Sequence, residues 1–231
     1  MDADFGSKDD DFRLQEVAAQ LADCEALTPY LDYLTLRSQG LRPQSLERLS
    51  HFLSQAINWP FPQRRDFTDR VLHLEHANPD LRNLIPQPLR AQLINPTLDE
   101  WIRESPQSAA PWRWRGSDDR NNWRGSYDDL RKALQLDPNE QIARERLITQ
   151  LLQPLNFAVH ELPAGYLGDI EYDLAAIDEI DNVCRGLYNK ALAAEVAIHS
   201  RRLRATIESY KQYKLSSNPR SFAEWSSRNP D

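Results

Sequence analysis

Glycine is scarce in this chain, which has seven glycines in 231 residues. Loops that hold phosphate groups need clustered glycines, because side chains would keep the backbone N–H groups away from the ligand. The seven glycines are spread along the sequence and form no such cluster. The sequence therefore argues against nucleotide-binding α/β folds.

Cysteines and long apolar segments are also few. Cys24 and Cys184 are the only cysteines, and they show neither the C-x-x-C spacing of zinc sites nor a disulfide framework. No stretch approaches the ~20 apolar residues that cross a bilayer, and the acidic first residues do not resemble a signal peptide. We therefore expect a cytoplasmic protein with free thiols and no membrane contact.

The chain is acidic, with a formal net charge of −7. General nucleic-acid binders carry surplus positive charge for their phosphate contacts, so the charge disfavours nucleic acid as a partner. Acids predominate in residues 1–27 and bases in residues 188–231. Ends of opposite charge attract each other or an oppositely charged partner.

Apolar residues recur three and four positions apart along most of the chain, and no strict alternation or β-hairpin dipeptide occurs. This pattern predicts an all-α protein of about eight to ten helices. We expect an irregular arrangement of right-handed, solenoid-like helical hairpins in two halves.

The sequence divides into five expected regions. They are an acidic flexible leader (1–11), an N-terminal helical half (12–104), a connecting segment rich in tryptophan and arginine (105–125), a C-terminal helical half (126–215) and a tail (216–231). Prolines punctuate residues 78–124, where we expect no long helix. Phe222 and Trp225 are candidate anchors for the tail.

Cap and breaker residues mark three helices of the C-terminal half. Ser126 is expected to cap the first helix, and Asp137 followed by Pro138 is expected to cap the second. Pro154 is expected to end that second helix, because proline cannot donate to a continuing helix. Asp169 is expected to cap a third helix.

The segment Ala133-Leu134-Gln135-Leu136-Asp137-Pro138-Asn139 resembles the junction between tetratricopeptide repeats. The resemblance covers about 25 residues, roughly 126–152, and no second copy follows 34 residues later. The aromatic pattern of the preceding repeat helix is also missing. The resemblance implies one helical hairpin and a scaffold that binds peptides or proteins.

Four of the six tryptophans lie between residues 101 and 123, and the part from Ser105 to Trp123 shows no sustained helical or strand period. The aromatic and basic candidates here are Trp112, Arg113, Trp114, Arg115, Trp123 and Arg124. If exposed, they suit recognition of another protein, or single-stranded nucleic acid through base stacking. If buried, the tryptophans fill a seam between the helical halves while the arginines stay solvated.

Six acids and no base lie between residues 169 and 181. Asp178 and Asp181 share one helix face, as do Asp169 and Asp173. Such a face suits a basic partner protein, a hard cation or an acid/base pair. A solvated face of a helix has the same composition.

The chain carries no catalytic motif, since it lacks G-x-S-x-G, and His73 and His76 do not have H-E-x-x-H spacing. We expect no catalytic residue, metal ligand or cofactor. Our hypothesis is a non-enzymatic adaptor, chaperone or immunity-type inhibitor that binds another protein, one of basic character. The partner-binding candidates are the six tryptophan and arginine side chains above with Asp178 and Asp181. The alternatives are an enzyme with a carboxylate or metal site at residues 169–181, and single-stranded nucleic-acid binding.

Overall fold

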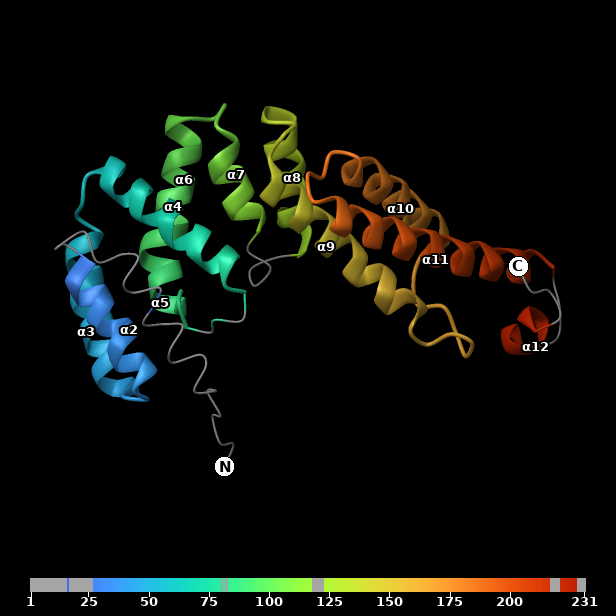
Figure 1. The fold of residues 1–231 in the computed structure, drawn as a ribbon, viewed down its shortest axis with the longest axis horizontal. Coiled ribbons are helices and arrows are strands. Elements are labelled where there is room, and N and C mark those ends of the chain that lie inside the picture. Colours follow the sequence, from blue (N-terminus) through green and yellow to red (C-terminus); the bar gives the residue numbers. More distant parts are fainter. Residues whose placement is uncertain are drawn as a thin grey trace. The chain divides into compact units, whose positions relative to one another are not determined.

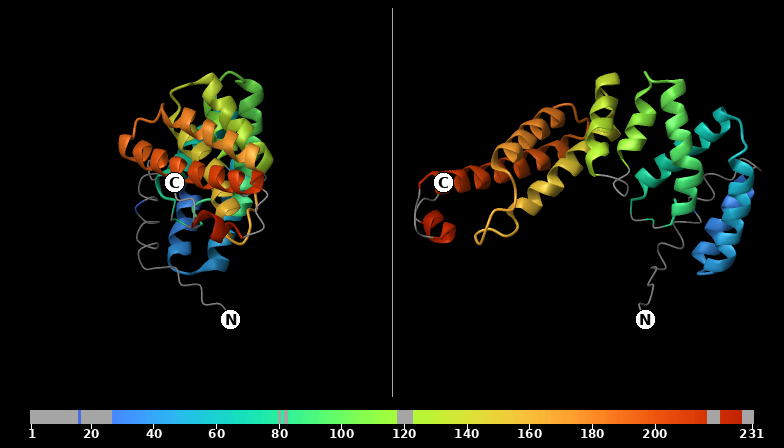
Figure 2. Two further views of the ribbon diagram at one scale, coloured as in Figure 1. Left: turned by 90° about the vertical axis from the view of Figure 1, so that its right-hand side faces the viewer. Right: turned by 180° about the vertical axis from the view of Figure 1, so that it is seen from behind.

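The computed structural model describes residues 27–79, 81, 83–117, 123–216 and 221–227, together with Glu16. These residues are all-α and include no strand, which confirms the predicted fold class (Figures 1 and 2). The predicted leader lies outside them. The chain separates into two compact units, one ending at Pro106 and the other beginning at Gln107.

The N-terminal unit consists of helices that come in succession along the chain. They are α2 (Thr28–Ser38), α3 (Arg42–Ala56), α4 (Phe61–Ala77), α5 (Gln87–Leu89), the π-helical segment η2 (Arg90–Ile94) and α6 (Asn95–Glu104). Gly40 joins α2 to α3 with a φ of 73°, a left-handed conformation that costs glycine little. The N–H of Leu41 then donates to the carbonyl of Leu36 at 2.9 Å, which closes the end of α2.

Aromatic rings form much of the core of the N-terminal unit. The ring of Tyr30 contacts those of Phe52 and Phe67, and its buried hydroxyl donates to the carbonyl of Leu84 at 2.6 Å. The hydroxyl of Tyr33 donates to the carbonyl of Asn83 at 2.7 Å. Burial raises the pKa of Tyr30, so its hydroxyl stays protonated and available as a donor.

Residues 87–104 contradict the expectation that prolines prevent a long element here. Helix α5, segment η2 and helix α6 follow one another without a break. The N–H of Asn95 bonds to the carbonyl of Arg90, five residues back, directly before Pro96. A widened turn lets the helix continue past a residue that has no N–H to donate.

The C-terminal unit contains α7 (Ala109–Gly116), α8 (Trp123–Leu136), α9 (Gln141–Val159), α10 (Ile170–Cys184), α11 (Lys190–Leu215) and α12 (Phe222–Ser226). Helices α9, α10 and α11 lie side by side (Figures 1 and 2). Their apolar faces and that of α8 meet in one core, which includes Leu130, Leu147, Leu151, Ile177, Ile180, Leu203 and Ile207.

Two of the expected helix starts in this unit differ from the structure. Helix α8 begins at Trp123, so Ser126 lies within it rather than capping it. Helix α9 is capped by Glu140, whose carboxylate accepts from the N–H of Ile142 at 3.3 Å. Asp137 instead accepts from the N–H of Asn139 at 2.9 Å and shapes the turn between α8 and α9, which pack together.

The expected cap of α10 and the expected anchor of the tail are confirmed. Asp169 accepts from the N–H of Tyr172 at 2.9 Å. Phe222 is buried, and the centroid of its ring lies 5.1 Å from that of Tyr210 and 5.5 Å from that of Tyr213. Aromatic contact therefore holds α12 on α11.

Helix α9 does not end at Pro154, as expected, but continues to Val159. Proline at position 154 leaves the carbonyl of Gln150 without its helical donor. The hydroxyl of Tyr127, from α8, donates to this carbonyl at 3.1 Å. A tertiary hydrogen bond thus replaces the one that proline removes, and the helix passes through.

Replacing Tyr127 by Phe should lower the free energy of unfolding by about 1 kcal/mol, because the Gln150 carbonyl then loses its donor. The loss of unfolding free energy should be smaller in a Pro154→Ala background, because the N–H that alanine brings to position 154 then donates to the Gln150 carbonyl. Urea unfolding of the four proteins, followed by circular dichroism, measures the coupling. Equal losses in both backgrounds would contradict this role for Tyr127.

Candidate functional site

The segment rich in tryptophan and arginine is not irregular throughout, as its sequence suggested, because residues Ala109–Gly116 form α7. Pro111 lies in the first turn, where a backbone N–H has no helical acceptor in any case. Eight residues make only about two turns, too few for an apolar period to show in the sequence.

The alternation of tryptophan and arginine produces contacts between neighbouring side chains of α7. The guanidinium of Arg113 lies 4.1 Å from the ring centroid of Trp114, and that of Arg115 lies 4.8 Å from Trp112. Trp114 is only 2% exposed, and Trp112 packs against the core of the C-terminal unit. The rings are therefore held within the unit and stacked by their own arginines.

The arginines of α7 also form ion pairs inside the unit. Arg113 is buried and donates to the carboxylate of Glu140 at 2.6 Å. Arg115 holds Asp129 with two hydrogen bonds, of 2.7 and 2.6 Å. The expectation that the arginines stay solvated is wrong for Arg113. Trp123 and Arg124 begin α8, and their side chains lie outside the described part of the structure.

The acids of residues 169–181 are mostly neutralised by bases of other helices. Asp178 and Asp181 both contact Arg204, at 2.7 and 3.2 Å. The other ion pairs are Glu179 with Arg131 and Glu171 with Lys211, both at 2.7 Å. Among the described residues, no group of three or more His, Cys, Asp or Glu side chains is placed to hold a metal ion.

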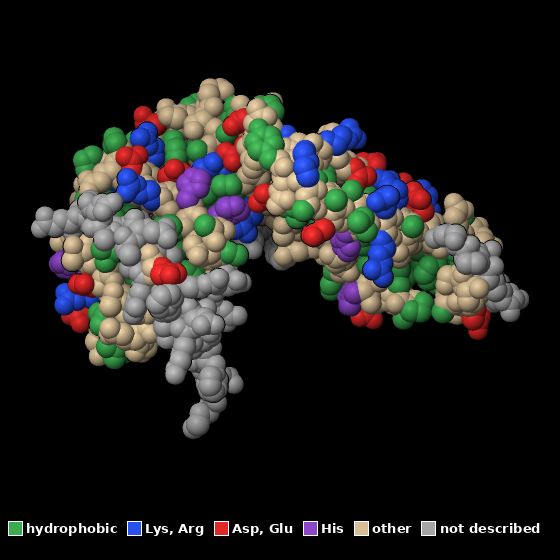
Figure 3. All heavy atoms as spheres, in the orientation of Figure 1, with side chains coloured by type: hydrophobic (Ala, Val, Ile, Leu, Met, Phe, Trp, Pro, Cys, Tyr) green, Lys and Arg blue, Asp and Glu red, His purple; other side chains and the backbone are tan. Residues whose placement is uncertain are grey.

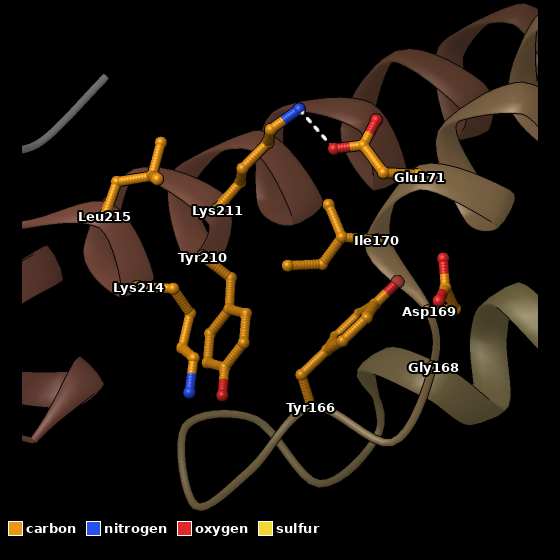
Figure 4. A pocket seen from close by; sticks show the side chains of 9 residues that line it. All are labelled: Tyr166, Gly168, Asp169, Ile170, Glu171, Tyr210, Lys211, Lys214 and Leu215. Carbon is orange, nitrogen blue, oxygen red and sulfur yellow. Dashed lines mark ion pairs between the residues drawn. The ribbon is translucent and has the colours of Figure 1, made fainter.

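A pocket of about 520 Å³ lies between the loop that precedes α10 and the last turns of α11 (Figure 4). We call it the tyrosine pocket, after Tyr166 in the loop and Tyr210 on α11. The two ring centroids are 5.3 Å apart, with an angle of 31° between the planes. Ile170 and Leu215 add apolar surface, and Leu215 is 69% exposed.

Charged groups of both signs border the tyrosine pocket. Lys211 and Glu171 form one ion pair across its edge. Lys214 is exposed and reaches along the ring of Tyr210 (Figure 4). Among the described residues, no carboxylate lies within ion-pair distance of Lys214, so its charge remains available to a ligand.

Backbone and side-chain hydrogen bonds hold the loop that carries Tyr166. The N–H of Leu167 donates to the carbonyl of Ala158 at 3.0 Å, and the hydroxyl of Tyr166 donates to the buried carboxylate of Asp173. Burial raises the pKa of Asp173, although the hydrogen bond from Tyr166 opposes this effect. Burial and the nearby carboxylate raise the pKa of Tyr166, so the phenol stays protonated.

Gly168 lets the loop approach α10 closely. A Cβ at this position would lie 2.0 Å from an Asp173 carboxylate oxygen and 2.8 Å from the Cβ of Ala158. Both distances are shorter than any van der Waals contact, so a larger residue would displace the carboxylate that holds Tyr166.

The sequence contained little sign of the tyrosine pocket. Tyr210 follows the apolar spacing of the last helix, which does not distinguish a core ring from one that also borders a pocket. Tyr166 and Lys214 belong to no motif. The pocket brings together positions more than forty residues apart, and only the packing of α10 on α11 makes them neighbours.

The visible face of the molecule shows Lys and Arg side chains interspersed with Asp and Glu (Figure 3). The described residues on that face form no broad basic area of the kind that tracks a phosphate backbone. None of the described helices is both long and apolar enough to cross a membrane.

Comparisons with other proteins identify no relative of this chain. No known protein family matches it, and neither curated proteins nor solved structures gave a match. The function is therefore inferred from the geometry of the chain itself.

Gly168→Ala should lower the free energy of unfolding by about 1–3 kcal/mol through overpacking against Ala158 and Asp173. Gly165→Ala is the matched control in the same loop, because no atom lies within 4 Å of a Cβ built there. Thermal denaturation of both variants tests the difference. Equal melting temperatures for the two variants would show that Gly168 is not required for this packing.

Glu140→Gln should lower the free energy of unfolding by about 1–3 kcal/mol, because it removes a carboxylate that accepts from the buried Arg113 guanidinium. Asp128→Asn is the control. Asp128 pairs with Arg131 on the surface and its side chain is 80% exposed, so the loss should stay below about 0.5 kcal/mol. Chemical denaturation measures both. Similar losses would contradict a structural role for the buried pair.

Proposed function

We propose that this protein is a non-enzymatic scaffold that binds another protein, as an adaptor, chaperone or inhibitor, through the tyrosine pocket. The observation that carries the proposal is an open pocket with two tyrosine walls, apolar Ile170 and Leu215, and the ammonium group of Lys214, which has no carboxylate partner among the described residues. Tyrosine is enriched at protein interfaces, since it supplies a large contact area with few rotatable bonds.

The lining of the pocket indicates what kind of peptide fits it. The rings of Tyr166 and Tyr210 contact each other, and an apolar or aromatic side chain can pack against them and Ile170, where it removes apolar surface from water. A carboxylate beside that side chain can pair with Lys214. We therefore propose that the pocket takes a peptide segment with an apolar anchor next to Asp or Glu.

This ligand differs from the basic partner that the acidic stretch suggested. Asp178, Asp181, Glu179 and Glu171 already contact arginine or lysine within the chain. A basic partner would have to displace these bases, which costs part of the attraction it gains. The acidic stretch therefore supports the proposal less well than the tyrosine pocket does.

Neither alternative function has a specific observation in its favour. The carboxylates of Glu171, Asp178, Glu179 and Asp181 pair with bases of the chain, and no group of three or more possible metal ligands occurs among the described residues. The ring of Trp114 is buried, and base stacking needs an exposed face. Protein binding therefore remains the single proposal.

The proposal is tested by selecting displayed peptides that bind the full chain. The affinity of a selected peptide is then measured by fluorescence anisotropy. Tyr210→Ala and Lys214→Glu should each weaken binding about tenfold or more. Tyr188→Ala and Lys132→Glu are matched controls on the same unit. Tyr188 is exposed, Lys132 is half-buried, and neither lines the pocket, so affinity should not change.

Two results would overturn the proposal. One is a selection that enriches no peptide, and the other is a peptide that binds the pocket variants and the controls equally well. Tyr210 also contacts Phe222, so the melting temperature of Tyr210→Ala is measured alongside. Lys214→Glu changes an exposed side chain and reports on binding even where Tyr210→Ala unfolds.

A further inference from the structure

A second cavity of the C-terminal unit, of about 380 Å³, lies where α10 ends and α11 begins. Arg185, Lys190 and Arg201 line it, around a wall formed by Cys184, Ala193 and Ala197. We call it the cationic cavity. It combines three bases with small, uncharged side chains, on a chain whose net charge is −7.

The positive charge of the cationic cavity is not neutralised by the residues around it. Asp181 is the acid on its edge, and its carboxylate lies 3.2 Å from Arg204, which is not part of the lining. Within the described part of the chain, no carboxylate is at ion-pair distance from Arg185 or Arg201. Lys190 donates to the carbonyl of Leu187 at 2.9 Å, which leaves its charge in place.

Helix dipoles do not account for this arrangement. Arg185 follows the last residue of α10, where a positive charge is favourable. Lys190, however, is the first residue of α11, where the dipole disfavours a positive charge. Arg201 lies in the middle of α11 and gains nothing from either end. All three bases are exposed, and a helix dipole favours the position of Arg185 alone among them.

We propose that the cationic cavity binds a small organic phosphate ester. Three bases match the charge of about −2 on a phosphate group, and the planar forks of two arginines suit its oxygens. Ala193, Ala197 and the side chain of Cys184 offer an uncharged wall for the organic part of the ester. The site is separate from the tyrosine pocket, and the proposal does not depend on the proposed function.

Isothermal titration of the full chain with phenyl phosphate and with inorganic phosphate tests the proposal. Phenyl phosphate should bind saturably and more tightly than inorganic phosphate, which cannot reach the uncharged wall. Arg185→Gln and Arg201→Gln should each weaken binding about tenfold, since each removes a charge-assisted hydrogen bond. Arg202→Gln is the matched control, because Arg202 is exposed and lies outside the lining.

Cys184 reports whether the ligand occupies this cavity rather than another surface. Phenyl phosphate should slow alkylation of Cys184 by iodoacetamide, and the effect should be lost in Arg201→Gln. Mass spectrometry of the Cys184 peptide distinguishes it from Cys24. Ala197→Leu fills the cavity without changing its charge. It should weaken the binding of phenyl phosphate as much as the arginine variants do.

Any one of the following results would overturn the proposal. They are the absence of saturable binding, equal weakening by Arg201→Gln and Arg202→Gln, and alkylation of Cys184 that phenyl phosphate does not slow. Equal affinity for inorganic and phenyl phosphate would also overturn it, because the uncharged wall would then contribute nothing. Circular dichroism of each variant confirms that weakened binding does not arise from unfolding.

Discussion

Pro154 leaves the carbonyl of Gln150 without a helical donor, and the hydroxyl of Tyr127 takes the place of that donor. This hydrogen bond satisfies the carbonyl that Pro154 leaves open within α9, the helix that extends to Val159 and packs against α8, α10 and α11. The side chain of Gln150 also donates to the carbonyl of Gly116 at 2.9 Å and so joins the end of α7 to α9. The loop that carries Tyr166 starts from the far end of this helix.

The most conspicuous clusters in the sequence are largely satisfied within the chain. In α7 the arginines stack on the tryptophans and pair with Glu140 and Asp129. Of the acids before and within α10, Asp169 caps the helix, Asp173 accepts from Tyr166, and the others pair with bases of α8 and α11. Such pairing stabilises the unit and leaves less of each cluster for a partner. The groups that remain available are inconspicuous in sequence, among them Lys214 and Arg201.

Both proposed binding sites belong to the C-terminal unit and use α11, yet they are separate. Arg201 and Lys214 are 13 positions apart, which corresponds to about 20 Å along a helix. One site offers aromatic walls for a peptide side chain, and the other offers concentrated positive charge for a phosphate. At this separation, substitutions in one site should have little effect on binding at the other.

The sequence alone determined the all-α class, the course of α10 and α11 and the cap at Asp169, because apolar spacing and capping are local properties. It misplaced the start of α8. It also misplaced the end of α9, because the hydroxyl of Tyr127 on α8 supplies the donor that Pro154 removes. It also left Tyr166, Tyr210 and Lys214 unrelated. Only the tertiary structure brings them together, because a pocket forms between side chains that packing places side by side, whatever their separation in the chain.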